Sequence, residues 1–457
     1  MLKAGRMSEG PGEHTELTPR SFASFGLMML GLGLLSVGFS VIDTAMVAPF
    51  GLVQVAAVGL GESVVSLLLA FFVGFIDVFT ARLARAEGAG QSDRVFPELL
   101  CAYLIVVGLM ELAAVVVAAA VWVVLPLVVS DQALAHAARQ YAAVRLLGVA
   151  LVAALSGVRE ALKIVGARTG SLAVYAVGLG MNAALNAVFL HVMSGTLAGA
   201  ATVAVAMATL VAQLFMTIIG GILLRRHLAV REFEPPSAAM VREQARTMAV
   251  RGAGVGVRHL NDYAGSTIPF VMAGTLGVTW VAASTVASTI WTLFCRVPQA
   301  CFGAAFVFYG YVSESGGAVA REVRRRIAIY SAIPMAVAVV VFLALSPALI
   351  WILTAGNLDT WTGMIMVAAF FIVVVPYFFE GLNGELLSVL EDGGFMSWTS
   401  TLTTWLGNIG FAAFGIFVLH SAFWAFALAV IPTIVLGSAF TWRLNHLTNR
   451  PMSLPQV

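Results

Sequence analysis

The chain has 457 residues, 60% of them hydrophobic and 11% charged, and its mean hydropathy is +0.96. These values exclude an ordinary soluble domain and identify a polytopic membrane protein. The net charge is only +2, from 25 Lys and Arg against 23 Asp and Glu, which argues against nucleic acid as a partner.

The apolar segments predict an all-α membrane protein. The first twenty residues are polar and the run after them is too long for a signal-peptide core, so we expect no cleaved signal. A helix needs about 20 residues to cross the hydrocarbon core. Twelve such stretches follow, near residues 22–45, 52–80, 97–127, 132–157, 170–193, 197–224, 247–275, 280–311, 327–353, 362–390, 395–419 and 421–442.

Basic residues cluster after every second predicted helix, so that 21 of the 25 Lys and Arg fall on one side. Loops that face the cytoplasm carry such an excess of positive charge. We therefore expect a multi-pass protein of the inner (plasma) membrane with both termini in the cytoplasm. Arg139 and Arg145, early in the fourth predicted helix, fit this pattern least well.

An internal repeat divides the chain into two halves. Residues 46–64 can be laid on residues 272–290 without a gap, so that Met46 falls on Met272 and Gly51 on Gly277. An even number of spans separates the two copies, which predicts two six-helix lobes related by a pseudo-two-fold axis along the membrane normal. The predicted divisions are an N-terminal tail 1–21, lobes 22–224 and 247–445 joined by a linker 225–246, and a C-terminal tail 446–457.

Seven acidic residues fall within the predicted spans, where charges are costly and tend to mark ion or substrate routes. They are Asp43, Glu62, Asp77, Glu111, Asp262, Glu380 and Glu385. We rank Glu385 below Glu380 because the two lie about 140° apart around their helix. We expect Glu62 and Glu111 to contact water or to be hydrogen-bonded, and Asp77 to be structural and within reach of Arg82 or Arg85.

Asp43 is the main candidate in the first half. Asn182 and Asn186 lie four residues apart and therefore share one helix face. Together with a hydroxyl such as that of Thr202, they offer the oxygen ligands that bind a small cation, and Na⁺ could sit on Asp43. Because burial disfavours a charge, the carboxyl group could instead take a proton. The alternative is that the asparagines only join helices and that Asp43 faces water.

The candidates in the second half are Asp262, in the seventh predicted span, and Glu380, four residues after Pro376. We expect the proline and two nearby glycines to open the helix locally around Glu380. Asp262 could pair with Arg258, one helical turn earlier, without excluding a transport role.

Several motifs are missing. The sequence contains no G-x-x-x-x-G-K-[ST], H-E-x-x-H or C-x-x-C pattern, which argues against nucleotide hydrolysis and against an enzyme. We expect no cofactor apart from a coupling ion, and energy from an ion gradient. The three cysteines fall within predicted helices, where we interpret them as packing residues.

The sequence resembles the MATE family, the multidrug and toxic compound extrusion transporters, over about residues 22–445. The stretches that carry this resemblance are IDTAMVAPFGLVQVAAVGLGESV at 42–64, RLARAEGAG at 82–90 and LKIVGART at 162–169. The resemblance implies a cation or proton site at Asp43, Asn182 and Asn186. It also implies a second site at Asp262 and Glu380, whose spacings from Gly252 and Leu390 match one bacterial branch with the two acid types exchanged.

From these features we expect a monomeric secondary transporter, an antiporter that exports small amphipathic organic compounds by alternating access driven by Na⁺ or H⁺. Its partners would be its substrate and membrane lipid. The alternatives are a flippase for lipid-linked or polysaccharide precursors and, from another class, a membrane-embedded enzyme. Arg258, His259 and Arg296 lie within spans of the second half. They either bind an anionic or zwitterionic substrate or neutralise Asp262 and Glu380.

Overall fold

The computed structural model describes residues 17–88, 91–165, 167–193, 200–229, 233–310, 317–390 and 392–448, and contains no strand among them. Its α-helices are α1 Pro19–Val47, α2 Leu52–Gly88, α3 Ser92–Val128, α4 Gln132–Leu146, α5 Val149–Ile164, α6 Arg168–Met193, α7 Ala200–Leu228, α8 Ala238–Ala273, α9 Val278–Gly310, α10 Gly317–Thr354, α11 Thr360–Phe371, α12 Val374–Val389, α13 Gly393–Leu402, α14 Gly410–Ala413, α15 Ala422–Ala427 and α16 Val430–Thr448. Two 3₁₀ turns, η1 Ala48–Phe50 and η2 Gly274–Leu276, and two π-helical segments, η3 Thr403–Ile409 and η4 Phe414–Val418, complete the described structure.

The predicted all-helical membrane fold is confirmed, although the number of spans is not fixed. Nine helices of the described part are long and apolar enough to cross a membrane, and two bent helix pairs bring the number to eleven. These eleven match eleven of the twelve predicted stretches. The remaining one, 247–275, covers most of α8 and the start of η2, and α8 contains Arg251, Arg258, His259 and Asp262 and is much less apolar than its neighbours. The count of twelve therefore stays a prediction.

The repeat read from the sequence is visible in the backbone. A shift of 226 positions, which carries Met46 onto Met272, also carries η1 onto η2 and the start of α2 onto the start of α9. Gly51 and Gly277 follow the two turns with φ angles of 108° and 97°. Both angles lie in the region that favours glycine, so the repeated glycines are explained by the turn that each must make.

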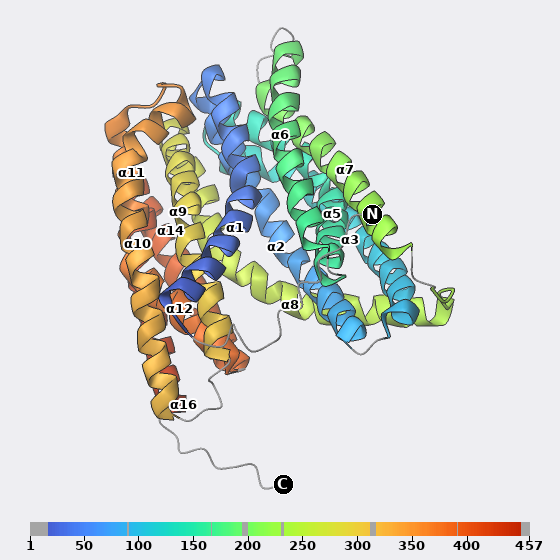
Figure 1. Cartoon of the computed structure of the whole chain (residues 1–457). Coiled ribbons are helices and arrows are strands. Elements are labelled where there is room, and N and C mark those ends of the chain that lie inside the picture. Colours follow the sequence, from blue (N-terminus) through green and yellow to red (C-terminus); the bar gives the residue numbers. More distant parts are fainter. Residues whose placement is uncertain are drawn as a thin grey trace, which may run out of the picture.

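Two groups of helices flank a shared middle (Figure 1). In this view α3, α5, α6 and α7 lie to the right and α9, α10, α11, α12 and α16 to the left, with α1 and α2 between them and α8 running across the lower part from the right toward the middle. The two halves of the chain meet mainly where α2 packs on α8 and α1 packs on α9. A Cβ atom at Gly74 of α2 would lie 2.2 Å from the backbone nitrogen of Gly256 and 2.4 Å from the carbonyl oxygen of Gly252. Small residues thus allow α2 and α8 to approach backbone to backbone.

Reciprocal contacts join the lobes at the end of the bundle that carries η1 and η2, hereafter the turn end, which is uppermost in Figure 1. Asn357, from the loop after α10, donates a hydrogen bond of 3.0 Å from its side chain to the carbonyl oxygen of Ala48 in η1. Ser130, from the loop after α3, donates to the carbonyl oxygen of Gly274 in η2 at 3.3 Å. Each 3₁₀ turn is therefore held by a loop of the other half.

Helix α1 is shared between the lobes. It bends by 41° between the segments Pro19–Leu35 and Val37–Phe50. The first segment packs on α9 and α10, where Phe22 lies against Phe308 and Tyr330. The second segment packs on α6, where Gly38 leaves room for Leu179. One continuous helix thus contacts both lobes through its two halves.

Two breaks differ from expectation. The fourth predicted span consists of α4 and α5, which meet at an angle of 47°. Glu111 accepts a hydrogen bond of 2.7 Å from the backbone N–H of Ala150 and so satisfies a free donor in the first turn of α5. In the second half, the helix opening expected around Pro376 and Glu380 occurs earlier, at Ile372 and Val373 between α11 and α12, whereas α12 continues through Glu380. Proline is tolerated in the first turn of a helix, which explains why the break comes before it.

The predicted linker 225–246 is partly helical. Helix α7 extends through Leu228 and α8 begins at Ala238, while residues 230–232 lie outside the described part of the chain.

Candidate functional site

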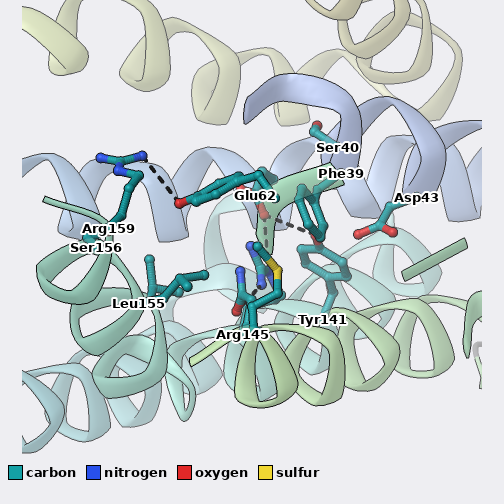
Figure 2. A pocket seen from close by; sticks show the side chains of 13 residues that line it. Phe39, Ser40, Asp43, Glu62, Tyr141, Arg145, Leu155, Ser156 and Arg159 are labelled. Atoms are coloured by element: carbon teal, nitrogen blue, oxygen red, sulfur yellow. Dashed lines mark hydrogen bonds and ion pairs between the residues drawn. The ribbon is translucent and has the colours of Figure 1, made fainter. Parts of the chain in front are cut away.

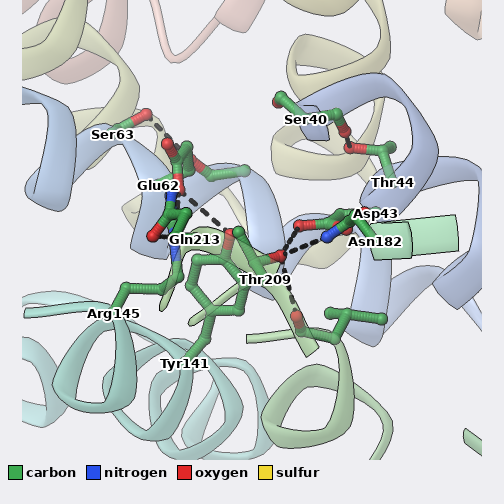
Figure 3. Close-up of polar contacts among 12 residues, drawn as sticks. Ser40, Asp43, Thr44, Glu62, Ser63, Tyr141, Arg145, Asn182, Thr209 and Gln213 are labelled. Carbon is green, nitrogen blue, oxygen red and sulfur yellow. Dashed lines mark hydrogen bonds and ion pairs between the residues drawn. The ribbon is translucent and has the colours of Figure 1, made fainter. Parts of the chain in front are cut away.

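Asp43 lies at the centre of a buried hydrogen-bond network formed by α1, α6 and α7 (Figure 3). Its side chain is almost fully buried, with a relative exposure of 2%, and Asn182 and Asn186 are completely buried. The side-chain amide of Asn186 donates to one carboxyl oxygen of Asp43 at 2.7 Å, and the hydroxyl oxygen of Thr209 lies 2.7 Å from the other. The structure therefore brings Asp43 and both predicted asparagines together.

The hydroxyl group of Thr209 has more partners than its single proton can serve. Its oxygen lies 2.7 Å from Asp43 Oδ2 and 2.9 Å from the carbonyl oxygen of Val205, and it accepts a hydrogen bond of 2.9 Å from Asn182 Nδ2. If Thr209 donates to Asp43, the contact suits an ionised carboxylate. If Thr209 donates to Val205, a proton on Asp43 completes the contact. The same heavy-atom geometry therefore fits both protonation states of Asp43.

The network also leaves an oxygen atom for a cation. Asn186 donates from Nδ2 to Asp43 Oδ1 and, at 3.2 Å, to Asn182 Oδ1. Both of its amide hydrogens are then used, and its own Oδ1 is buried without a hydrogen-bond partner among the described residues. A buried amide oxygen beside a carboxylate is a suitable ligand for a small hard cation. The residues present thus fit the Na⁺ alternative as well as the proton alternative.

The hydroxyl group that contacts Asp43 belongs to Thr209 and was missed by the sequence analysis, which named Thr202. Thr202 is buried on the same helix, α7, seven residues earlier. Seven residues are close to two helical turns, so both side chains share one face of α7 but differ in depth by about 10 Å. The sequence thus indicated the face of α7 that carries Thr209, and the role expected of Thr202 as an ion ligand stays a prediction.

A second charged cluster lies beside Asp43. Arg145 and Glu62 form an ion pair with 3.4 Å between Arg145 Nε and Glu62 Oε2, and their side chains are 8% and 25% exposed. The hydroxyl group of Tyr141 donates to the same Glu62 oxygen at 3.0 Å, and Arg145 Nη1 donates to Gln213 at 3.4 Å. Arg145, which did not fit the pattern of loop charges, is therefore a buried partner of an acid.

Asp43 and this cluster line one cavity of about 240 Å³ within the first lobe (Figure 2). In the figure, Tyr141 separates the carboxyl group of Asp43 from the guanidinium group of Arg145. Arg159 lines the same cavity and bonds to Glu160 at 2.9 Å and to the hydroxyl group of Tyr175 at 3.3 Å. Both arginines of this cavity therefore already have protein partners.

A larger cavity of about 320 Å³, hereafter the central cavity, lies between the lobes and is lined by residues of α1, α2, α8 and α9. Sixteen of its eighteen lining residues form eight pairs related by the shift of 226 positions, among them Ser40 with Ser266 and Gly59 with Thr285. The central cavity is therefore built on the pseudo-two-fold axis. Glu62 and Ser40 line this cavity and also the cavity of the first lobe.

The candidates of the second half are only partly placed. The side chains of Arg258 and Asp262 lie outside the described part of the structure, so their proposed ion pair stays a prediction. His259 Nε2 lies 2.8 Å from Asp77 Oδ2 on α2, so Asp77 is bound across the lobes by His259. Arg82 instead contacts Gln244, and Arg85 bonds to the carbonyl oxygen of Ala81.

Arg296 lines the central cavity and donates to Gln299 at 3.1 Å, and Gln299 in turn donates to the hydroxyl group of Tyr377 at 3.3 Å. Glu380 follows Tyr377 by one turn of α12 and lies where that helix packs on Gly437. Glu380 and Asp262 thus stay predicted ion-coupling residues, while Arg296 is placed at a cavity wall.

Comparisons with known proteins agree with the resemblance found in the sequence. Residues 30–188, a little over a third of the chain, match the family model named MatE. No curated protein sequence matches the chain.

Solved structures share the fold of this chain, among them the following three. The first is an inward-facing multidrug resistance MATE family transporter of the MOP superfamily, with a TM-score of 0.69 and 18% identity over 95% of this chain and 100% of that one. An outward-facing structure with the same description has a TM-score of 0.66 and 19% identity, over 95% and 97% of the two chains. A MATE structure in a straight conformation has a TM-score of 0.63 and 18% identity, over 94% and 97%. The chain is therefore a multi-pass membrane protein with the fold of the MATE transporters.

Proposed function

We propose that this protein, which has the MATE fold, is a secondary active exporter of small organic compounds driven by Na⁺ or H⁺. The observation that carries the proposal is the network around Asp43: a buried carboxyl group whose contacts fit both protonation states, next to a buried amide oxygen that has no hydrogen-bond partner among the described residues. Such a group can load and release a small positive ion.

An antiporter needs more than an ion site, because an ion shifts a conformational equilibrium only by its difference in affinity for the two states. Asp43 lies on the second segment of α1, which packs on the first lobe, while the first segment of the same helix packs on α9 and α10. In our proposal, an ion that enters and binds at Asp43 changes the packing of α1 on α6 and α7. That change would favour one orientation of the lobes and expel substrate.

The solved structures that share the fold are described as transporters, which supports a transporter over a membrane enzyme. The flippase alternative has no observation of its own in this structure. We further propose that the protein lies in the inner (plasma) membrane as a monomer with both termini in the cytoplasm, as the placement of its basic residues predicts. The ion would be transported cargo, with no resident cofactor.

The test is a flux assay in proteoliposomes with an imposed Na⁺ or pH gradient and a panel of fluorescent organic compounds. We expect gradient-driven export by the wild type and none by Asp43→Asn, which keeps the size of the side chain and removes its charge. Asp359→Asn is a matched control, because Asp359 is an acid in an exposed loop at the start of α11. Export by Asp43→Asn at the wild-type rate under both gradients would contradict the proposal.

A further inference from the structure

The central cavity is lined by more hydroxyl groups than a site for amphipathic organic cations would need. Ten of its eighteen lining residues are serine or threonine, and its only aromatic side chains are Tyr263 and Phe270. Amphipathic organic cations are usually bound by aromatic faces and unpaired carboxylates. The lining of this cavity therefore favours a ligand that forms several hydrogen bonds.

Half of these hydroxyl groups already donate their proton to the helix that carries them. Thr44, Ser63, Thr285 and Thr289 each donate to the backbone carbonyl oxygen four residues earlier, at 2.8 Å, and Ser266 donates to Tyr263 at 3.0 Å. What such a hydroxyl group still offers is an oxygen atom that accepts. The cavity is therefore suited to a ligand with N–H or O–H donors.

Glu62, the acidic residue that lines the central cavity, has its negative charge balanced by other groups of the protein. Glu62 is the one carboxylate among the lining residues, and its Oε2 atom is bound by both Arg145 and Tyr141. The guanidinium group of Arg145 lines the cavity of the first lobe and not the central cavity. Glu62 thus contributes little free negative charge to attract a cation.

Arg296, the basic residue that lines the central cavity, has no partner of opposite charge among the described residues. Among the described residues Arg296 forms no ion pair, and its hydrogen bond goes to the neutral side chain of Gln299. Its Nε atom is buried without a hydrogen-bond partner, and its Cδ atom packs over Gly33 of α1, 3.1 Å from where a Cβ would lie. The shift of 226 positions relates Arg296 to Ala70 of the first half, so this charge has no counterpart there. The uncompensated charge in the described wall is therefore positive.

From these contacts we infer that the central cavity binds small organic compounds that carry an anionic group, a carboxylate or an equivalent oxyanion, together with N–H or O–H donors. Arg296 binds the anionic group and the hydroxyl-rich walls accept from the donors. Zwitterions belong to this class, whereas compounds that are only cationic do not. This inference rests on the proposed function and specifies the substrate class of the exporter.

The test measures equilibrium binding to the purified full-length protein in detergent, without any gradient. The probes are 7-(diethylamino)coumarin-3-carboxylate and its ethyl ester, which share a fluorophore and differ in the anionic group. We expect the carboxylate to bind at least about tenfold more tightly than the ester, which is the range of a charge-assisted hydrogen bond. We expect Arg296→Gln to remove that preference and Arg296→Lys to keep part of it.

Two controls separate recognition from folding. Arg139→Gln removes a guanidinium group that stacks on Trp122 outside the central cavity, and should leave the preference intact. Asp262→Asn tests the alternative, raised by the sequence, that Arg296 only neutralises Asp262. If that alternative held, Arg296→Gln would destabilise the protein and Asp262→Asn would restore its melting temperature without any effect on probe binding.

The inference is overturned if ester and carboxylate bind equally to the wild type, or if ethidium, a permanent cation, binds more tightly than the carboxylate and Arg296→Gln does not change this order. Its failure can be told apart from failure of the proposed function. If the protein exports cations under a gradient but does not prefer the carboxylate, the proposed export function holds and only the substrate class is wrong. If it binds the carboxylate but shows no gradient-driven flux, the proposed export function is wrong.

Discussion

Gly59 and Thr285 touch each other and are also equivalent residues of the two halves. A Cβ atom on Gly59 would lie 2.0 Å from Thr285 Oγ1, and the shift of 226 positions carries one residue onto the other. Two equivalent residues meet only at the axis that relates their halves. The contact therefore marks the pseudo-two-fold axis, and glycine is required on one side because threonine fills the other.

The contact predicts that Gly59→Val forces α2 and α9 apart near the turn end. Overpacking of this kind costs about 1–3 kcal/mol. We expect a lower melting temperature in detergent and slower transport, and we expect Thr285→Gly in the same chain to recover most of both. Gly180→Val is a suitable control, because a Cβ at Gly180 would meet no atom within 4 Å. Equal effects of the two valine substitutions would show that α2 and α9 are not in close contact at this point.

The Glu62–Arg145 pair predicts a coupled loss of stability. Glu62→Gln keeps an acceptor for Tyr141 but leaves the guanidinium group of Arg145 buried without a carboxylate. Because Glu62 retains some exposure, we expect a cost of about 1.5–3 kcal/mol, below that of a fully buried pair. Arg145→Met added to Glu62→Gln should recover part of the loss in a double-mutant cycle followed by thermal unfolding.

The exposed pair Glu322–Arg326 on α10 supplies the comparison, since both side chains are about half exposed. Glu322→Gln should change stability by no more than about 0.5 kcal/mol. Strictly additive effects of Glu62→Gln and Arg145→Met would indicate that the two residues do not interact.

The position of Thr209 predicts a difference between two threonines on one face of α7. Thr209→Val keeps the shape of the side chain and removes the hydroxyl group that contacts Asp43. We expect export driven by the coupling gradient to fall about tenfold or more, the effect of losing a hydrogen bond to a charged group. Thr202→Val should leave the dependence on the gradient unchanged. The flux assay with Na⁺ and pH gradients decides, and the reverse order of effects would identify Thr202 and not Thr209 as the hydroxyl group that serves the ion.

Asp359, outside the membrane spans, predicts a pH effect at the start of α11. The backbone N–H of Thr362 donates to its carboxylate at 3.0 Å, and this bond, supported by the Thr362 hydroxyl group, lowers the pKa of Asp359 below its ordinary value of 3.8. A carboxyl group whose pKa is lower in the folded state stabilises the fold above the unfolded pKa, and the contribution is lost as the pH falls through the folded pKa.

The comparison with Asp359→Asn isolates this contribution, because asparagine also caps helices but does not titrate in this range. We expect the difference in melting temperature between wild type and variant to be constant above pH 5 and to shrink below about pH 4. A difference that grows on acidification would mean that the carboxylate does not cap α11.

The sequence predicted those features that depend on spacing along one helix or between the two halves. Asn182 and Asn186 share a face because they are four residues apart, and both reach the Asp43 network. The repeat of residues 46–64 in residues 272–290 predicted two equivalent turns, which the structure shows as η1 and η2. Spacing gives the direction of a side chain around its helix but not the depth at which helices from different parts of the chain meet. For this reason the sequence did not single out Thr209 as the hydroxyl group that contacts Asp43.

Pairings between distant helices were beyond the sequence for the same reason. Nothing along the chain joins Glu62 to Arg145 or Asp77 to His259, since each pair depends on how two helices pack. A signal was nevertheless present for Arg145, because a basic residue that does not fit the loop pattern of a membrane protein needs a buried partner. The sequence analysis expected the helix to open around Glu380, whereas it breaks at Ile372 and Val373. The break comes earlier because proline disrupts the hydrogen bond to the carbonyl group one turn before it.

The bent helix α1 gives the molecule a mechanical property that its separate lobes would not have. One arm of this helix is anchored to α9 and α10 and the other to α6, and the two arms meet at a joint near residue 36. Any rotation of one lobe relative to the other must change the bend of α1 or break the packing of one of its two segments. A crosslink that fixes either segment of α1 to the helix it packs on should therefore slow the whole transport cycle, although it would contact neither the ion nor the substrate.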